Sequence, residues 1–208
     1  MRSLGAKCTS DVMRGKIVVI VVGLPGSGKS TAAQILKSMD FKVIELGDIW
    51  RELLKKSAVA RNDPVATREF TRQLREREGK DVYARYAYRS IRRSREMVAI
   101  MGVRSTYEMD YFKKRMPQLR IIALLAPFSV RFERVMARSK PEDHRTLKWF
   151  KWQEQREKQG FMDKKSEEKH GVMRVIDNAD YAIANVSTVA RFRHDMRKVV
   201  SAIKARNS

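Results

Sequence analysis

The sequence predicts an α/β fold in which a parallel sheet of five strands lies between two layers of helices. Two observations support this fold class. Short apolar runs recur along the chain without polar alternation, which is typical of strands buried on both faces of a parallel sheet. Segments with helical periodicity separate these runs. The 208 residues fit one domain with a substantial core.

A glycine-rich turn follows the first apolar run, residues 17–22, and reads G-x-x-x-x-G-K-S from Gly23 to Ser30. Glycines let successive backbone N–H groups converge on a phosphate at the positive end of the next helix. In this pattern Lys29 reaches the β- and γ-phosphates, and the Ser30 hydroxyl binds Mg²⁺. The segment therefore predicts a three-layer P-loop NTPase fold. Its nucleotide-binding residues are Gly23, Leu24, Pro25, Gly26, Ser27, Gly28, Lys29, Ser30 and Thr31.

The other strands are expected where short apolar runs recur, at residues 41–46, 97–101, 119–126 and 181–186. Helices are expected near residues 29–37, 49–54, 65–77, 81–95, 105–116 and 147–158, after Pro127, and from Ser187 onward. Ser105 and Glu108 have the spacing of a capping box. One face of the last helix is expected to dock on the sheet through Val189, Phe192, Met196, Val199 and Ile203.

The chain is expected to form one domain, residues 16–208, after a flexible tail at residues 1–15. Residues 140–171 are extremely polar and show no strand pattern, and they end in a charged loop at 163–170. This composition favours a mobile lid over the phosphates, placed at residues 139–171.

The charge balance is strongly basic, with 45 Lys and Arg against 24 Asp and Glu and a formal net charge of +21. Such an excess either solubilises the protein or binds a polyanion such as RNA. The single cysteine, Cys8, excludes an internal disulfide and suits a reducing cytoplasm. No apolar run approaches the roughly 20 residues needed to span a bilayer, so no membrane partner is expected.

Asp48 follows the second strand and either caps the next helix or belongs to a ligand site. The second reading is supported because parallel α/β sheets bind ligands at the carboxyl ends of strands, and we expect this strand next to the P-loop strand. Arg51 lies one helical turn further on and shares a face with the Asp48 carboxylate.

Arginines recur at helical spacing on several expected helices. The helix at 65–77 carries Arg68, Arg72 and Arg75, and the helix at 81–95 carries Arg85, Arg89, Arg92 and Arg93. These stripes are either solvated faces of amphipathic helices or a surface for a phosphate-rich partner. After Pro127, Arg131, Arg134 and Arg138 are spaced to line one face of a helix.

Four segments, in order, resemble the P-loop nucleoside and nucleotide kinases of the adenylate kinase and dephospho-CoA kinase type. They are FKVIELGDIWR at 41–51, GVRSTYE at 102–108, RFER at 131–134 followed by Arg138, and ADYAIAN at 179–185. The resemblance covers nearly the whole chain and is strongest to an uncharacterised archaeal branch of these kinases. It implies that Asp48 is a general base, that Arg104 grips the acceptor's phosphate and that Asn185 lies near the nucleotide base. It also implies an acceptor-binding helical region at residues 48–95.

The chain departs from this pattern at three places. Met101 stands where relatives carry an aspartate that helps hold the water shell of Mg²⁺. Gln153 and Glu154 align with an Arg-Asp pair of the lid, whose arginine neutralises charge on the moving phosphoryl group. Residues 161–170 lengthen the lid beyond the family pattern.

The resemblance implies an ATP- and Mg²⁺-dependent phosphotransferase acting on a small nucleotide-like acceptor. Its catalytic residues are Lys29, Asp48, Arg104, Arg134 and Arg138, and its acceptor is held by Asp48, Arg51 and Arg104. ATP binds the P-loop and Asn185, and Ser30 binds the metal. The alternative is a kinase-derived ATP-binding module that binds RNA or a ribonucleoprotein through its basic surface.

Overall fold

The computed structural model describes residues 16–57, 59–94, 97–138, 146–159 and 171–207. The expected tail at 1–15 and the charged loop at 163–170 therefore lie outside the described residues, as does much of the expected lid. Five strands form one sheet: β1 (Val18–Val22), β2 (Phe41–Glu45), β3 (Met97–Met101), β4 (Arg120–Leu125) and β5 (Tyr181–Ala184). All of their pairings are parallel, which confirms the predicted fold class.

The strand order in the sheet is β2-β3-β1-β4-β5. The P-loop strand β1 lies in the centre, and all five of its residues are buried, as its unbroken apolar run predicts. The expectation that β2 neighbours β1 is wrong, because β3 pairs with both of them. Asp48 therefore follows a strand that is separated from the P-loop strand by β3.

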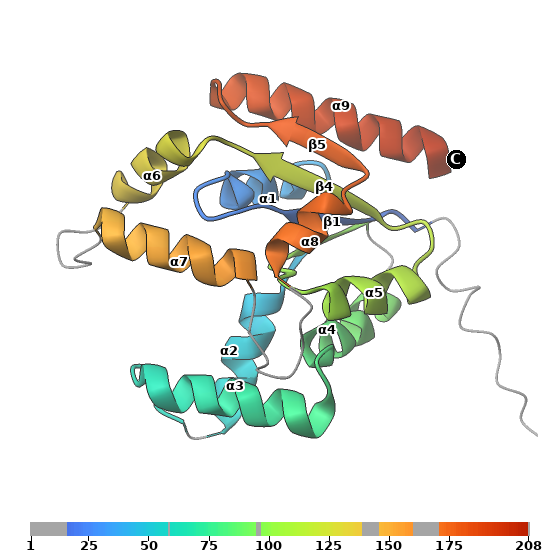
Figure 1. The fold of residues 1–208 in the computed structure, drawn as a ribbon. Helices are drawn as coiled ribbons and strands as arrows, with labels where there is room; N and C mark the ends of the chain where they lie inside the picture. Colours follow the sequence, from blue (N-terminus) through green and yellow to red (C-terminus); the bar gives the residue numbers. More distant parts are fainter. Residues whose placement is uncertain (1–15, 58, 95–96, 139–145, 160–170, 208) are drawn as a thin grey trace, which may run out of the picture.

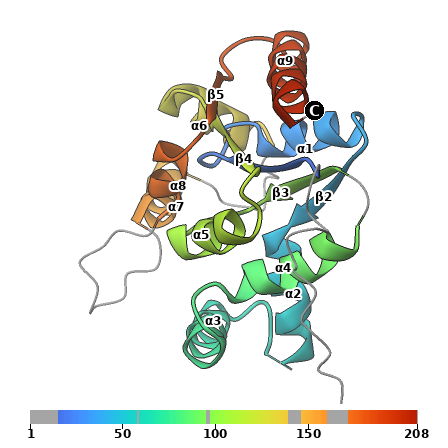
Figure 2. The ribbon, with the colours of Figure 1, turned by 90° about the vertical axis from the view of Figure 1, so that its right-hand side faces the viewer.

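Helices cover both faces of the sheet (Figures 1 and 2). On one face, α1 (Lys29–Lys37) and the long α9 (Val189–Asn207) enclose a core with residues of β1, β3 and β4. On the other face lie α4 (Val82–Arg93), α5 (Thr106–Arg115) and α8 (Val172–Asp177). The helices α2 (Leu46–Lys56) and α3 (Pro64–Glu78) extend this second layer away from the sheet (Figure 1). The helices α6 (Phe128–Met136) and α7 (Leu147–Gln159) lie at the carboxyl end of β4 (Figure 1).

Two helices begin with side-chain caps, of which the sequence indicates the one at Ser105. The Asp63 carboxylate accepts hydrogen bonds from the Val65 and Ala66 amides at the start of α3. The Ser105 hydroxyl accepts one from the Glu108 amide at the start of α5. In the expected capping box Glu108 would return this bond to Ser105, but its carboxylate instead accepts from the Arg104 amide, 2.9 Å away.

The structure differs from the sequence analysis at three local points. Asp48 is not an N-cap, because α2 already begins at Leu46, with Glu45 as its cap residue. The helix α8 was not expected, and it buries Val172 and Val175. On α9, Val189 is exposed and Val200 is buried instead, together with Phe192, Met196 and Ile203. No helix within the described ranges is both long and apolar enough to cross a membrane.

Candidate functional site

The turn from Gly23 to Ser30 joins the central strand to α1, so the amino end of α1 faces the carboxyl edge of the sheet. Two glycines in it have positive φ, 79° at Gly26 and 105° at Gly28, which other residues rarely adopt. Space is also limiting at both positions. A Cβ atom on Gly26 would collide with the carbonyl of Arg131, and one on Gly28 would collide with the side-chain amide of Asn185. The tight turn therefore needs glycine for its conformation and for its neighbours.

Substitution of Gly28 by alanine tests this double requirement. We expect Gly28→Ala to lower the free energy of unfolding by about 1–3 kcal/mol, because the backbone is strained and Asn185 is displaced. Urea denaturation measures this loss. Gly47→Ala is the matched control, since Gly47 lies in α2 with ordinary φ and its nearest neighbour would be 3.4 Å from the new Cβ. Equal stability of the two variants would contradict the requirement.

Lys29 is the first residue of α1, and its ammonium group donates hydrogen bonds to the carbonyls of Gly23, at 2.6 Å, and Leu24, at 3.0 Å. Burial lowers its pKa, and the carboxylate of Glu157 opposes that shift. The ammonium thus lies across the mouth of the turn. Ser30, the next residue, is exposed there. The hydroxyl of Ser27 is buried in the turn without a hydrogen-bond partner among the described residues.

A side-chain brace holds the turn from behind. Asn185, which follows β5, is only 6% exposed, and its amide donates a 2.9 Å hydrogen bond to the carbonyl of Ser27. Arg134 of α6 in turn donates to the carbonyl of Asn185 at 3.0 Å. The structure thus brings both predicted residues to the P-loop. In this conformation their polar groups are engaged with the backbone.

A buried ion pair connects the P-loop to α7. Arg131 of α6 is 4% exposed and Glu154 of α7 is 5% exposed, and their charged groups lie 2.5 Å apart. Arg131 also donates hydrogen bonds to the carbonyls of Ala126 and Pro25, and Lys158 reaches Glu154 at 2.5 Å. Burial alone would raise the pKa of Glu154, but the hydrogen bonds from Arg131 and Lys158 lower it below its ordinary value. We call Arg131, Glu154 and Lys158 the α6–α7 latch.

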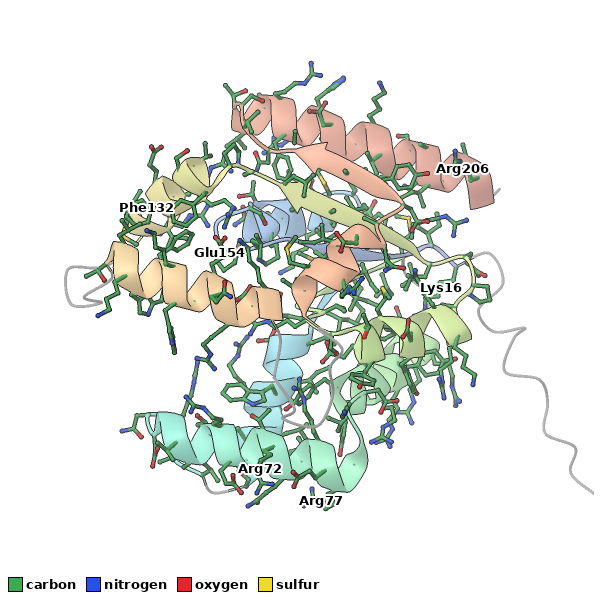
Figure 3. All side chains as sticks on the ribbon, viewed as in Figure 1. Lys16, Arg72, Arg77, Phe132, Glu154 and Arg206 are labelled. Atoms are coloured by element: carbon green, nitrogen blue, oxygen red, sulfur yellow. The ribbon has the colours of Figure 1, made fainter. Side chains whose placement is uncertain are left out.

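Aromatic side chains surround this latch. Phe150 of α7 is fully buried and packs against Phe128 and Phe132 of α6, with ring centroids 5.3 Å and 5.6 Å away. Figure 3 shows Phe132 and Glu154 at the junction of the two helices. The Arg131–Glu154 pair of the latch is therefore shielded from water, whereas Lys158 is partly exposed. Shielding makes the ion pair strong but makes either charge costly without the other. The latch fixes α7 beside the P-loop.

A second group of charged side chains faces the P-loop from the carboxyl end of β3. Arg104 follows β3, and its guanidinium is 63% exposed and lies 3.7 Å from the carboxylate of Glu157 on α7. The charges of both Glu157 and Arg104 act on Lys29. Asp48 and Arg51 of α2 form an exposed ion pair with each other, as their spacing predicts. The edge of the sheet thus carries Arg104 near the lysine of the turn, and both Lys29 and Arg51 of α2 act on Glu45 at the end of β2.

The predicted arginine stripes are less uniform than their spacing suggests. On α3, Arg68 is exposed, but Arg72 is paired with Glu69 and Glu76. Arg75 does not belong to an exposed stripe, because it turns inward to 3.8 Å from the buried Glu108. Figure 3 shows Arg72 and Arg77 on the side of α3 away from the sheet.

On α4, the exposed arginines are Arg89, Arg92 and Arg93, whereas Arg85 donates to the carbonyl of Glu78. Of the expected row on α6, Arg131 and Arg134 lie on the helix, but Arg138 does not. Arg131 is buried in the latch, and Arg138 is exposed beyond the C-cap residue Ala137.

The site offers the oxygen donors that Mg²⁺ prefers. The Ser30 hydroxyl is exposed at the start of α1, and the carboxylates of Glu45 and Asp48 belong to the end of β2 and the start of α2. Within the described residues no cluster of three or more His, Cys, Asp or Glu side chains forms a closed metal cage. These donors fit a hydrated ion held together with nucleotide phosphates rather than an ion held by protein alone.

Several residues of this site had not been identified from sequence. The latch pair Arg131–Glu154 and the contact of Glu157 with Arg104 join segments more than twenty residues apart, and no local pattern reports such a pairing. Glu45 could have been found from its place, because it is the last residue of β2 and therefore lies at the ligand-binding edge.

The comparisons with known proteins agree with this geometry. The model of a family described as AAA domain matches residues 19–170. The UPF0200 protein of Methanothermobacter thermautotrophicus is 32% identical over 185 residues, covering 88% of this chain and 89% of that protein. The UPF0200 protein of Sulfurisphaera tokodaii is 31% identical over 187 residues, covering 89% of this chain and 97% of that protein.

Solved structures show the same fold at low sequence identity. TT1252 from Thermus thermophilus aligns with a TM-score of 0.58 and 18% identity over 93% of this chain and 98% of its own. A dephospho-CoA kinase from Campylobacter jejuni aligns with a TM-score of 0.50 and 17% identity over 91% of this chain and 98% of its own. The chain is therefore a P-loop kinase-like protein, and it belongs to the AAA domain family and to the UPF0200 proteins.

Proposed function

We propose that this protein is an ATP- and Mg²⁺-dependent phosphotransferase acting on a small nucleotide-like acceptor. The observation that carries the proposal is the convergence of three cationic groups on one edge of the sheet. Lys29 belongs to the P-loop, Arg104 ends β3 and Arg51 belongs to α2. Phosphoryl transfer depends mainly on positioning two phosphate-bearing molecules and on neutralising their charge.

Each group has a distinct role in this proposal. The amides of the turn and Lys29 hold the β- and γ-phosphates of the nucleotide at the amino end of α1. Arg104 and Arg51 hold the anionic acceptor, and Asp48 accepts the proton if the acceptor is a hydroxyl. Arg134 of α6 and Arg138, which follows that helix, close over the transferring group. When bound through Ser30, Mg²⁺ supplies neutralisation of charge on the phosphate oxygens.

Glu157 is the natural group for a phosphate to replace. Its carboxylate lies near Arg104 and acts on Lys29, so it is a negative charge between two cations assigned to phosphates. An incoming acceptor phosphate would bind the same guanidinium more strongly, because it offers several charged oxygens. This exchange explains how α7 can lie close to the site before the acceptor is bound.

The function is tested by following the γ-phosphate of radiolabelled ATP. Nucleoside monophosphates and dephospho-CoA are offered as acceptors, and products are separated by chromatography. We expect the label to move to one class of small acceptor. Release of all label as inorganic phosphate with every acceptor would contradict the proposed reaction.

Arg104→Ala should separate acceptor binding from nucleotide binding. We expect the KM for the acceptor to rise by about 10–100-fold, since a charge-assisted contact to phosphate is lost. The dissociation constant of ATP should stay within about twofold of the wild-type value. Arg115→Ala is the control, since Arg115 is the last residue of α5, the helix that begins after Arg104, and it stacks on Tyr111, 3.7 Å from the ring centroid. An unchanged KM in Arg104→Ala would remove that residue from the acceptor site.

A second candidate function is RNA binding by a module with little kinase activity. The observation that favours it is the formal net charge of +21, which exceeds what a phosphate site needs. The exposed arginines of the predicted stripes include Arg68 on α3 and Arg89, Arg92 and Arg93 on α4. Filter binding of transfer RNA over a range of salt concentrations tests it. Binding that persists at physiological salt supports this function, whereas binding only at low salt contradicts it.

A further inference from the structure

The residue that ends β3 provides no carboxylate at the nucleotide site. Met101 is buried and offers no oxygen ligand at the carboxyl edge of the sheet. The neighbouring strand supplies a carboxylate at the same level. In the parallel register of β2 with β3, the partner of Met101 is Glu45, and both residues are the last of their strands.

The Glu45 carboxylate is turned toward the end of β3. A Cβ atom on Gly102, the residue after Met101, would collide with its Oε1 atom. Gly102 has a positive φ of 77°, so this position carries a residue without a side chain that leaves room for the carboxylate. The charges acting on Glu45 come from Arg104, Asp48, Lys29 and Arg51. Glu45 therefore lies within electrostatic reach of the P-loop lysine although β3 separates β2 from β1.

The other acidic groups around this edge are engaged. Asp48 is paired with Arg51, and Glu157 lies 3.7 Å from Arg104. Glu108 is buried and accepts a hydrogen bond from the Arg104 amide. The half-buried carboxylate of Glu45, in contrast, has no hydrogen-bond or ion-pair partner among the residues that the structure describes. A carboxylate that is partly removed from water without a protein partner is costly, which favours a role in binding a ligand.

We propose that Glu45 accepts hydrogen bonds from the water shell of the Mg²⁺ ion that enters with the nucleotide, and so replaces the carboxylate missing at Met101. This inference rests on the proposed nucleotide-binding function. Mg²⁺ gives up its water reluctantly, so proteins hold it largely through carboxylates that bind its waters. Ser30 and the phosphates supply direct oxygen ligands, and Glu45 positions the remaining waters. Glu45 is thus a positioning residue and takes no part in bond making.

The test measures metal-dependent binding rather than turnover. Isothermal titration with the non-hydrolysable analogue AMP-PNP is carried out with Mg²⁺ and with EDTA. For the wild type we expect tighter binding with Mg²⁺. In Glu45→Gln this metal-dependent gain should fall by about 10–100-fold, which is the typical effect of losing an outer-shell partner. Its binding in EDTA should match the wild type or be slightly tighter, because a negative charge beside the phosphates is removed.

Two further variants sharpen the test. Glu52→Gln is the matched control, since Glu52 is exposed on α2, and it should retain the full metal-dependent gain. Glu45→Asp keeps the carboxylate and should retain part of the gain. Electron paramagnetic resonance of Mn²⁺ gives an independent readout, because the ion bound with AMP-PNP should be held less tightly by Glu45→Gln than by the wild type.

The outcomes separate this inference from the proposed function. If the wild type binds AMP-PNP neither with Mg²⁺ nor with EDTA, the proposed function itself fails. If the wild type binds with a metal-dependent gain that Glu45→Gln keeps in full, Glu45 has no role toward the metal and only this inference is overturned. The same conclusion follows if Glu45→Gln weakens binding equally in both conditions, since that pattern indicates a purely structural role.

Discussion

Lys29→Ala is expected to abolish ATP-dependent phosphoryl transfer while the protein stays folded. The ammonium lies at the mouth of the turn, where its hydrogen-bond partners among the described residues are the Gly23 and Leu24 carbonyls, and it can move onto a bound phosphate. Removing a charge that stabilises the transferring phosphoryl group should lower the rate by roughly 10³-fold or more. The rate is measured by release or transfer of the γ-label from ATP.

The control for this variant is Lys37→Ala. Lys37 lies at the exposed last turn of the same helix, so its loss removes an equal charge from α1 without touching the turn. It should retain wild-type activity. Turnover by Lys29→Ala at the rate of Lys37→Ala would remove the P-loop lysine from the mechanism. Circular dichroism of both variants should superimpose on that of the wild type.

Glu154→Ala is expected to be the most destabilising single change near the site. It leaves the Arg131 guanidinium, which is 4% exposed, without its carboxylate partner. Breaking one side of a buried ion pair costs about 3–5 kcal/mol in the free energy of unfolding. Urea denaturation measures this loss in the free energy of unfolding. The control is Glu133→Ala on the exposed side of α6, which should change the free energy of unfolding by less than about 0.5 kcal/mol. If Glu154→Ala lost no more stability than Glu133→Ala, the latch would not hold α7.

The pH dependence of the free energy of unfolding gives a second test of the α6–α7 latch. Because Arg131 and Lys158 lower the pKa of Glu154, the folded protein binds this proton less readily than the unfolded chain. The stabilisation that ionised Glu154 contributes is therefore complete above the ordinary pKa of a glutamate. It is lost as the pH falls through the lowered pKa of Glu154 in the folded protein. The difference in stability between the wild type and Glu154→Ala should shrink over the same acidic range.

The sequence predicted most elements correctly because their signals are local. The unbroken apolar run of β1, the Ser105 cap and the G-x-x-x-x-G-K-S turn each depend on residues that are neighbours along the chain. The short helix α8 escaped because six residues show too little periodicity to distinguish a helix from a loop.

Relations between distant segments could not be read from the chain. Whether β2 or β3 pairs with β1 depends on packing across the whole sheet, so the placement of Asp48 relative to the P-loop strand was wrong. The spacing of Arg131 places it on one helix face with Arg134, but its burial and its pairing with Glu154 on another helix could not be predicted from that spacing. The partnerless carboxylate of Glu45 became visible only when the register placed it beside Met101.

The central claim is that a nucleoside triphosphate binds with its phosphates on the turn from Gly23 to Ser30. Isothermal titration of the wild-type protein with ATP, with and without Mg²⁺, tests it most directly, with Lys29→Ala titrated alongside. We expect heat of binding at a single site for the wild type, tighter binding when Mg²⁺ is present, and affinity weakened by about tenfold or more in Lys29→Ala. Absence of heat from ATP in both conditions, or equal affinity of the two proteins, would contradict the claim.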